Sequence, residues 1–256
     1  MYLLTLSFPA YSKILYGWML IAVLVFFLLL KVTAPYGRHS SAKWGPLISN
    51  RWGWVIMELP VLLMLFYFLA PYASTISAVS WVMIGLFCLH YFNRTFVFPL
   101  RIHTKGKKMP LVIALMGVSF NLVNGFSLGY YFAHYANYTN DWFFDIRFIS
   151  GLLLFFAGLL INWVADEKLI HLRKPGETHY TIPRGWLFDY ISCPNLFGET
   201  IEWLGFAILC WNLPALSFFV WTAANLLPRA LSHHQWYRKQ FSDYPTGRKA
   251  VFPFIM

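Results

Sequence analysis

Long apolar stretches, separated by short polar connections, run through most of the 256-residue chain. Each is close to the roughly 20 residues that an α-helix needs to cross the hydrocarbon core of a bilayer. They lie at 13–31, 54–72, 78–99, 110–134, 147–165, 196–212 and 214–232. Only Asn212-Leu213-Pro214 separates the last two, which predicts a tight turn between two helices. The pattern predicts an all-α, multi-pass membrane protein with about seven transmembrane helices, folded as a single domain over residues 1–256.

The composition and the placement of the charges agree with this class. Hydrophobic residues make up 59% of the chain and charged residues 12%, against about 25% charged in soluble domains. A net charge of +10 would suggest a nucleic-acid partner in a soluble protein, but here the basic residues gather in alternate connections, at 32–53, 100–109, 166–188 and in the C-terminal tail. The positive-inside rule then predicts a cytoplasmic C-terminus and an outside N-terminus, in either a bacterial inner membrane or an endoplasmic reticulum membrane. We expect no nucleic acid.

The segment 192–203 is the most informative part of the chain. It places Asn195, Glu199 and Glu202 at the start of an apolar helix, and their spacing of i, i+4, i+7 puts them on one face. A carboxylate at membrane depth costs roughly 3 to more than 10 kcal/mol unless it faces protein, water or a polar ligand. We therefore expect something polar to bind at this stripe.

Polar residues also interrupt the second and third apolar stretches. Glu58 precedes Pro60 in the second, and His90, Tyr91 and Arg94 lie near the cytoplasmic end of the third. Tyr91 and Arg94 are neighbours at i, i+3 and could face one cavity. Plainer interpretations stay open, because Glu58 could reach the interface or pair with an arginine, and tyrosine and arginine are common at membrane interfaces.

A further polar pair, Asn162 and Asp166, shares a helix face at the cytoplasmic end of the fifth stretch. An ordinary helix end accounts for Asp166 but accounts poorly for Asn162. The connection that follows carries Arg173 and Tyr180, and it holds too many large side chains for a passive linker.

The last stretch carries Asn225, Arg229, His233 and Tyr237 at intervals of four. Such a stripe extends about 18 Å along a helix, which is the scale of an extended dinucleotide. Arginine suits phosphate, and histidine and tyrosine suit ribose or amide groups. The alternative is an interfacial helix that binds anionic lipid headgroups.

Several familiar signatures are absent from the sequence. There is no G-x-G-x-x-G, Walker A or H-E-x-x-H motif, so a dinucleotide would lie among helices and not on a Rossmann sheet. Cys88, Cys193 and Cys210 show neither disulfide nor metal-ligand spacing. His233 and His234 are adjacent and point in different directions on a helix. We expect no metal site.

Longer motifs surround these residues. In the C-terminal third they are Leu172-Arg-Lys-Pro-Gly-Glu177, Tyr180, Gly185-Trp-Leu-Phe-Asp-Tyr190, 195–203, Arg229, His233, Tyr237 and Asp243-Tyr-Pro245 with Arg248-Lys249. Further upstream stand His90-Tyr-Phe-Asn-Arg-Thr-Phe-Val97 and Glu58-Leu-Pro60. Through these motifs the sequence resembles the steroid 5-alpha-reductase family from the second stretch to the C-terminus, and the first stretch matches only in character.

The resemblance implies a seven-helix membrane oxidoreductase, an NADPH-dependent 3-oxo-5-alpha-steroid 4-dehydrogenase that transfers hydride to C5 of a 3-keto-4-ene steroid. The catalytic residues would be Glu58 and Tyr91, which would meet the 3-keto oxygen. The cofactor-binding residues would be Arg94, Asn162, Asp166, Arg173, Tyr180, Asn195, Glu199, Arg229, His233 and Tyr237, so about 160–256 would carry most of the cofactor site. The expected partners are a steroid or other lipid substrate from the bilayer and membrane lipids, with no obligate protein partner.

Two departures and three alternatives accompany this interpretation. Met57 stands where family members often have glutamine, and Asn93 where the mammalian enzymes have histidine, so the preferred steroid stays open. A related membrane reductase could act on an enoyl thioester or a polyprenol derivative. An ion-coupled transporter could use the intramembrane acids, although the chain has no internal repeat. A methyltransferase using S-adenosylmethionine is a further alternative, for which the stripe 225–237 is long.

Overall fold

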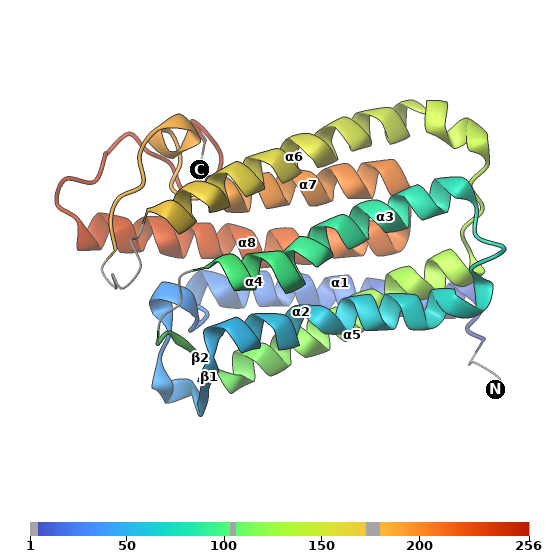
Figure 1. Cartoon of the computed structure of the whole chain (residues 1–256), viewed down its shortest axis with the longest axis horizontal. Coiled ribbons are helices and arrows are strands. Elements are labelled where there is room, and N and C mark those ends of the chain that lie inside the picture. The colour runs from blue at the N-terminus through green and yellow to red at the C-terminus, as the bar shows by residue number, and fades with distance from the viewer. Residues whose placement is uncertain (1–4, 103–105, 173–179, 256) are drawn as a thin grey trace.

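The structure is a computed structural model, and it describes residues 5–102, 106–172 and 180–255. Its long helices run side by side in one bundle (Figure 1). Within the described residues these are α1 (Phe8–Lys31), α2 (Asn50–Leu69), α3 (Ala78–Phe92), α5 (Leu111–His134), α6 (Ile146–His171), α7 (Pro194–Cys210) and α8 (Leu213–Gln240). The short elements are α4 (Phe98–Arg101), the 3-10 turns Gly37–His39, Ala42–Trp44, Ala70–Tyr72, Asn140–Phe144 and Trp186–Asp189, and the antiparallel strands β1 (Leu47–Ser49) and β2 (Lys108–Pro110).

The predicted helical class is confirmed, and each predicted stretch is largely helical. In the described part of the chain, five helices are long and apolar enough to cross a membrane: Phe8–Lys31, Asn50–Tyr72, Ala78–Arg101, Leu111–His134 and Ile146–His171. α7 and α8 are not among them, because α7 has only 17 residues and the apolar part of α8 is interrupted by Asn225 and Arg229. The count of seven transmembrane helices and the orientation of the termini stay predictions.

The third stretch, 78–99, is not the uninterrupted helix that its pattern predicts. α3 ends at Phe92, and a π-helical segment, Asn93–Val97, joins it to α4. The N–H of Phe98 donates to the carbonyl oxygen of Asn93, five residues back, and Pro99 has no N–H to donate. Widened turns of this kind are frequent at functional sites. This one carries Arg94, whose side chain points into the bundle.

α6 and α7 make the closest helix pair, and glycines allow the approach. A Cβ atom at Gly158 would lie 2.2 Å from the backbone nitrogen of Glu202, and one at Gly198 would lie 2.4 Å from that of Asn162. A side chain at either position would push the helices apart. The close approach sets the polar face of α6 directly against the polar first turns of α7.

The chain begins and ends at opposite ends of the bundle (Figure 1). The end that holds the C-terminus, here called the basic end, gathers the connections 32–49, 106–110, 180–193 and 241–255. These segments carry many of the lysines and arginines. Their common location agrees with the alternation of basic connections along the sequence. α8 continues to Gln240 and so extends past its predicted end at 232 into this region.

Candidate active site

A cavity of about 850 Å³ lies among α1, α2, α3, α5, α7 and α8. Apolar side chains of α1 and α5 line one part of it, among them Val25, Leu28, Ile113 and Met116. Polar side chains line the remainder, and most of them belong to the stripes seen in the sequence. The cavity therefore has an apolar region and a polar region next to each other.

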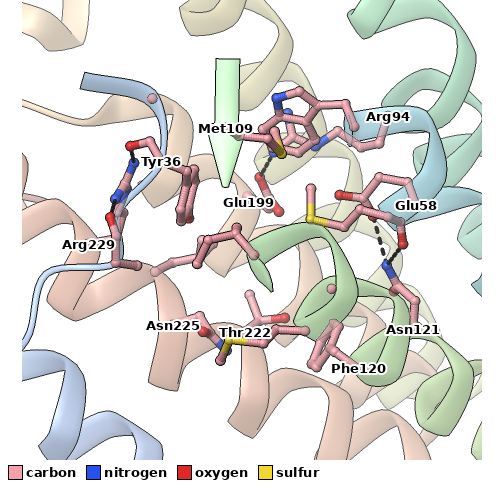
Figure 2. A pocket seen from close by; sticks show the side chains of 18 of the residues that line it. Tyr36, Glu58, Arg94, Met109, Phe120, Asn121, Glu199, Thr222, Asn225 and Arg229 are labelled. Atoms are coloured by element: carbon pink, nitrogen blue, oxygen red, sulfur yellow. Dashed lines mark hydrogen bonds and ion pairs between the residues drawn. The ribbon is translucent and has the colours of Figure 1, made fainter. Parts of the chain in front are cut away.

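Figure 2 shows how the polar groups are distributed around this cavity. Arg229 lies at one side of the view and Glu58 at the other, and Glu199 lies between them. Two chemically different regions follow from this distribution. One is centred on carboxyl and amide groups near Glu58, and the other is basic and faces the connection 32–49.

Arg94, from the π-helical segment, lies between two carboxylates. Its Nη1 donates to Oδ2 of Asp166 at 3.2 Å, and its Nη2 donates to Oε2 of Glu199 at 2.8 Å. The side-chain amide of Asn195 donates to Oδ1 of Asp166 at 3.1 Å. That of Asn162 donates to Oε2 of Glu199 at 3.3 Å and to the carbonyl oxygen of Asn195 at 3.0 Å. One guanidinium serves two carboxylates, so the network keeps acceptor capacity for donors on a ligand.

The structure thus brings five predicted site residues from three separate parts of the sequence into one network. Asn195 and Glu199 line the cavity, as do Arg94 and Asp166. Asn162 is fully buried on α6, and its side-chain amide donates to the backbone of α7 at Asn195. Its role in this arrangement is to fix the positions of its neighbours.

Tyr91 and Glu58, the predicted catalytic pair, are joined through Asn121 on α5. The Tyr91 hydroxyl donates to Oδ1 of Asn121 at 3.1 Å. The Asn121 amide donates to Oε2 of Glu58 at 3.2 Å and to the backbone carbonyl of Met57 at 2.7 Å. Tyr91, Glu58 and Asn121 all line the cavity. Asn121 was not singled out in the sequence, although an asparagine inside an apolar stretch is a signal that could have found it.

Arg229 is engaged with the protein itself. Its Nη1 donates to the carbonyl oxygen of Ala34 at 2.8 Å and its Nη2 to that of Tyr36 at 2.7 Å. Its guanidinium also lies 3.7 Å from the centre of the Tyr36 ring. Arg229 therefore fixes the connection after α1 against α8, and its cofactor contact stays a prediction. Asn225, on the same stripe, donates to a carbonyl of its own helix.

The remaining members of the α8 stripe also contact this connection. Nδ1 of His233 lies 3.2 Å from Nε2 of His39, and the two rings are stacked. The Tyr237 hydroxyl accepts a hydrogen bond of 3.1 Å from Nη2 of Arg38. Burial, followed by the positive charges of Arg229 and Arg38, lowers the pKa of His39 to about 4. His39 is consequently neutral at neutral pH.

Arg38 is a second residue that the sequence did not reveal. Its guanidinium lies 5.2, 4.9 and 4.3 Å from the ring centres of Tyr180, Trp236 and Tyr237. Its Nη1 is buried and has no hydrogen-bond partner in the described part of the chain. Arg38 and Tyr180 both line the cavity, so a cationic donor is held ready at the basic end.

Two predicted positions do not join these networks. Arg173 lies outside the described residues. Glu202 shares its predicted stripe with Asn195 and Glu199, but it does not line the cavity and its side chain instead meets His90. Three residues on from Glu199, it is rotated by about 60° around the helix, which is enough to turn it toward α3.

The fold and the cavity define a multi-pass helical membrane protein with an internal cavity that is apolar on one side and polar on the other. The sequence model of the family described as 3-oxo-5-alpha-steroid 4-dehydrogenase matches residues 107–256. Steroid 5-alpha-reductase DET2 of Gossypium hirsutum is 43% identical over 227 residues, covering 87% of this chain and 88% of the relative. The 3-oxo-5-alpha-steroid 4-dehydrogenase 1 of Bos taurus is 40% identical over 240 residues, covering 92% and 93%. The 3-oxo-5-alpha-steroid 4-dehydrogenase 2 of Homo sapiens is 43% identical over 223 residues, covering 86% and 87%.

The chain therefore belongs to the 3-oxo-5-alpha-steroid 4-dehydrogenase family, and it is an oxidoreductase. The resemblance inferred from the motifs is confirmed. The transporter and methyltransferase alternatives are therefore excluded, because members of this family are oxidoreductases.

Proposed function

We propose that the protein reduces the 4,5 double bond of 3-keto-4-ene steroids, with NADPH as the cofactor and C5 as the carbon that is reduced. The observation that carries this proposal is the linkage of Tyr91 and Glu58 through Asn121 beside an apolar cavity. A conjugated ketone in such a cavity needs hydrogen-bond donors at its oxygen. The names of the relatives, steroid 5-alpha-reductase and 3-oxo-5-alpha-steroid 4-dehydrogenase, support the same chemistry.

The roles of the two donors follow from where charge develops. As C5 is reduced, negative charge builds on the 3-keto oxygen. The Tyr91 hydroxyl and a protonated Glu58 would donate to that oxygen, in surroundings where water does not weaken the interaction. Asn121 holds both groups before a ketone arrives, because its amide oxygen accepts from Tyr91 and its amide nitrogen donates to Glu58.

The residues present fit a nicotinamide dinucleotide. Asn195 and Glu199 offer an amide and a carboxylate, which suit ribose hydroxyls or a carboxamide. At the basic end, Arg38 has a buried Nη1 without a partner among the described residues, and Lys107 and Lys108 line the same region. Such cations suit phosphate. When bound, NADPH would supply the hydride.

Other predicted cofactor residues would act through these. Asp166 and Asn162 would hold Arg94, Asn195 and Glu199 in place by the bonds described above. Arg229, His233 and Tyr237 would hold the connection that carries Arg38. The apolar side chains of α1 and α5 would give a fused-ring substrate a route from the bilayer, whichever membrane contains the protein.

The test is a substrate panel with purified protein in detergent. The protein is incubated with NADPH and with progesterone, testosterone or an enoyl-CoA, and the products are identified by mass spectrometry. We expect 5-alpha-reduced steroids from the wild type and little product from Tyr91→Phe. Reduction of the enoyl-CoA alone would instead support a related lipid reductase. Tight NADPH binding without turnover of any member of the panel would support the cofactor assignment but refute the proposed substrate class.

A further inference from the structure

A buried ionisable pair lies directly beside the candidate active site and has no role in the function proposed above. Nδ1 of His90 on α3 and Oε1 of Glu202 on α7 are 2.8 Å apart. The two residues are 3% and 0% exposed. The second carboxyl oxygen of Glu202, Oε2, is buried and has no hydrogen-bond partner among the residues that the structure describes.

These surroundings favour a pair of two neutral groups, a protonated carboxyl group and a neutral imidazole, each holding one exchangeable proton. The ring of Trp203 lies 4.6 Å from that of His90, and the charged groups nearby, Arg94 and Glu199, are already bonded to each other. An ionised carboxylate with one oxygen unpaired in this interior would be costly, whereas a neutral acid uses its proton in one bond and leaves only a carbonyl oxygen. The arrangement therefore favours donation from Oε1 of Glu202 to Nδ1 of a neutral His90.

This donation fixes the tautomer of His90. Because Nδ1 accepts, the ring hydrogen lies on Nε2, on the side of the ring away from Glu202. His90 lines the same cavity as its neighbour Tyr91. Successive residues on a helix point about 100° apart, so the two side chains would address different atoms of one bound molecule.

Besides the hydrogen-bond donors at the 3-keto oxygen, the proposed reaction needs a proton donor at C4. Reduction at C5 by the nicotinamide cofactor leaves an enolate, and the saturated ketone forms only when C4 takes up a proton. We propose that His90 delivers this proton and that Glu202 replaces it, an inference that rests on the function proposed above. Tyr91 then needs only to stabilise the charge on the ketone oxygen.

The proton transfer balances in three steps. The enolate electron pair forms the C4–H bond as the Nε2–H bond of His90 breaks. The O–H proton of Glu202 moves to Nδ1, which leaves His90 neutral in its other tautomer and Glu202 as a carboxylate. A proton from bulk water then adds to Nε2 of His90 while the Nδ1–H proton returns to the Glu202 carboxylate, and the hydroxide left behind is neutralised by the buffer. His90 thereby recovers its first tautomer.

The competing explanation is that the His90–Glu202 pair only connects α3 to α7. The variant Glu202→Gln distinguishes this structural role from the proton relay. The glutamine amide can still donate to Nδ1 and fills the same space, but it has no proton to release. We expect kcat for progesterone to fall about 10²-fold, with a larger solvent deuterium isotope effect and nearly unchanged KM values for steroid and NADPH. The control is Tyr138→Phe, which removes a part-buried hydroxyl that donates to the Cys210 carbonyl away from the cavity. It should leave kcat and the isotope effect unchanged.

Infrared spectroscopy of the protein without cofactor or steroid gives a readout that is independent of turnover. The wild type should show the C=O stretch of a protonated acid that disappears in Glu202→Gln and shifts in His90→Phe. Absence of any such difference overturns the proposal even if the variants are inactive. Wild-type turnover in Glu202→Gln, with an unchanged isotope effect, refutes the proton relay alone. A wild-type protein that reduces no 3-keto-4-ene steroid refutes the proposed function instead.

Discussion

Tyr91 on α3 donates a hydrogen bond of 3.1 Å to the side-chain oxygen of Asn121 on α5. Through its nitrogen, the same amide also bonds to the backbone carbonyl of Met57 on α2 at 2.7 Å. Three helices are thereby connected at the point where the substrate ketone is expected. The orientation of the proposed donors consequently depends on a residue that has no acid–base chemistry of its own.

Replacement of Asn121 by leucine should therefore impair catalysis more than stability. The change removes the acceptor for Tyr91 and the donor for Glu58, and each such bond contributes about 0.5–1.5 kcal/mol. We expect kcat to fall roughly ten-fold or more, because 1.4 kcal/mol corresponds to about a factor of ten. Asn124→Leu is the matched control, since Asn124 lies buried on the same helix, outside the cavity lining, and donates to the Phe120 carbonyl of its own helix. Equal losses of kcat in both variants would contradict the bridging role.

The donors themselves give a second prediction. Tyr91→Phe keeps the ring and removes the hydroxyl, and loss of one donor to a developing oxyanion costs about 10²–10³ in kcat. NADPH affinity should hardly change, because the contribution appears in the transition state. Tyr131→Phe, outside the cavity, should behave as wild type. Glu58→Gln separates polarisation from acid catalysis, and activity near wild type there would mean that Glu58 only polarises the ketone.

The helical fold was more predictable from the sequence than the contacts within the candidate site. The helices and the polar stripes were predictable, because hydropathy and i, i+4 spacing depend only on local sequence. The family resemblance implied that Arg94, Asp166 and Glu199 belong to one cofactor site, but the hydrogen bonds among them were not predicted, since the three lie on different elements. Glu202 departs from the predicted polar stripe because the positions i, i+4 and i+7 cover about 60° around the helix, and packing decides which part of that arc faces the cavity.

Arg38 and Asn121 were missed for a different reason. Arg38 lies in a connection where a basic residue is expected for orientation alone, so only its position among three aromatic rings reveals it. The break of the third stretch at Asn93–Val97 was also unforeseen, because a π-helical turn leaves no clear mark in hydropathy.

Glu199 should be needed for NADPH binding. Glu199→Ala removes one of the two carboxylates that pair with Arg94 at the wall of the cavity, together with an acceptor that a ligand could use. We expect loss of both NADPH binding and turnover, measured by fluorescence titration and by product formation. Glu167→Ala is the control, because Glu167 forms an exposed pair with Arg101 away from the network. NADPH binding retained with turnover lost would make Glu199 a catalytic residue.

Arg38 should bind a phosphate of the cofactor. Arg38→Met keeps most of the apolar stem and removes the charge, so the Kd for NADPH should rise about ten-fold, in line with the 1.5–3 kcal/mol typical of charge-assisted hydrogen bonds. Arg184→Met removes an exposed arginine that bonds to Asp243 and should leave the Kd unchanged. Arg229→Met should also weaken binding, by releasing the carbonyls of Ala34 and Tyr36. An unchanged Kd in Arg38→Met would exclude that arginine from the phosphate site.

His39 should make the folded protein sensitive to mild acid. Burial, Arg229 and Arg38 lower its pKa to about 4, whereas an unfolded chain keeps a value near 6.5. Between these values the unfolded state binds more protons, so this contribution to stability is present above about pH 6.5 and is lost as the pH falls toward 4. Protonation would also add a cation beside Arg38 and put a hydrogen on both nitrogens of the ring stacked on His233. His39→Gln keeps a polar side chain that cannot titrate. Thermal unfolding followed by tryptophan fluorescence should therefore show a smaller drop in Tm between pH 7 and pH 5 for His39→Gln than for the wild type, whereas equal drops would assign the acid sensitivity to other groups.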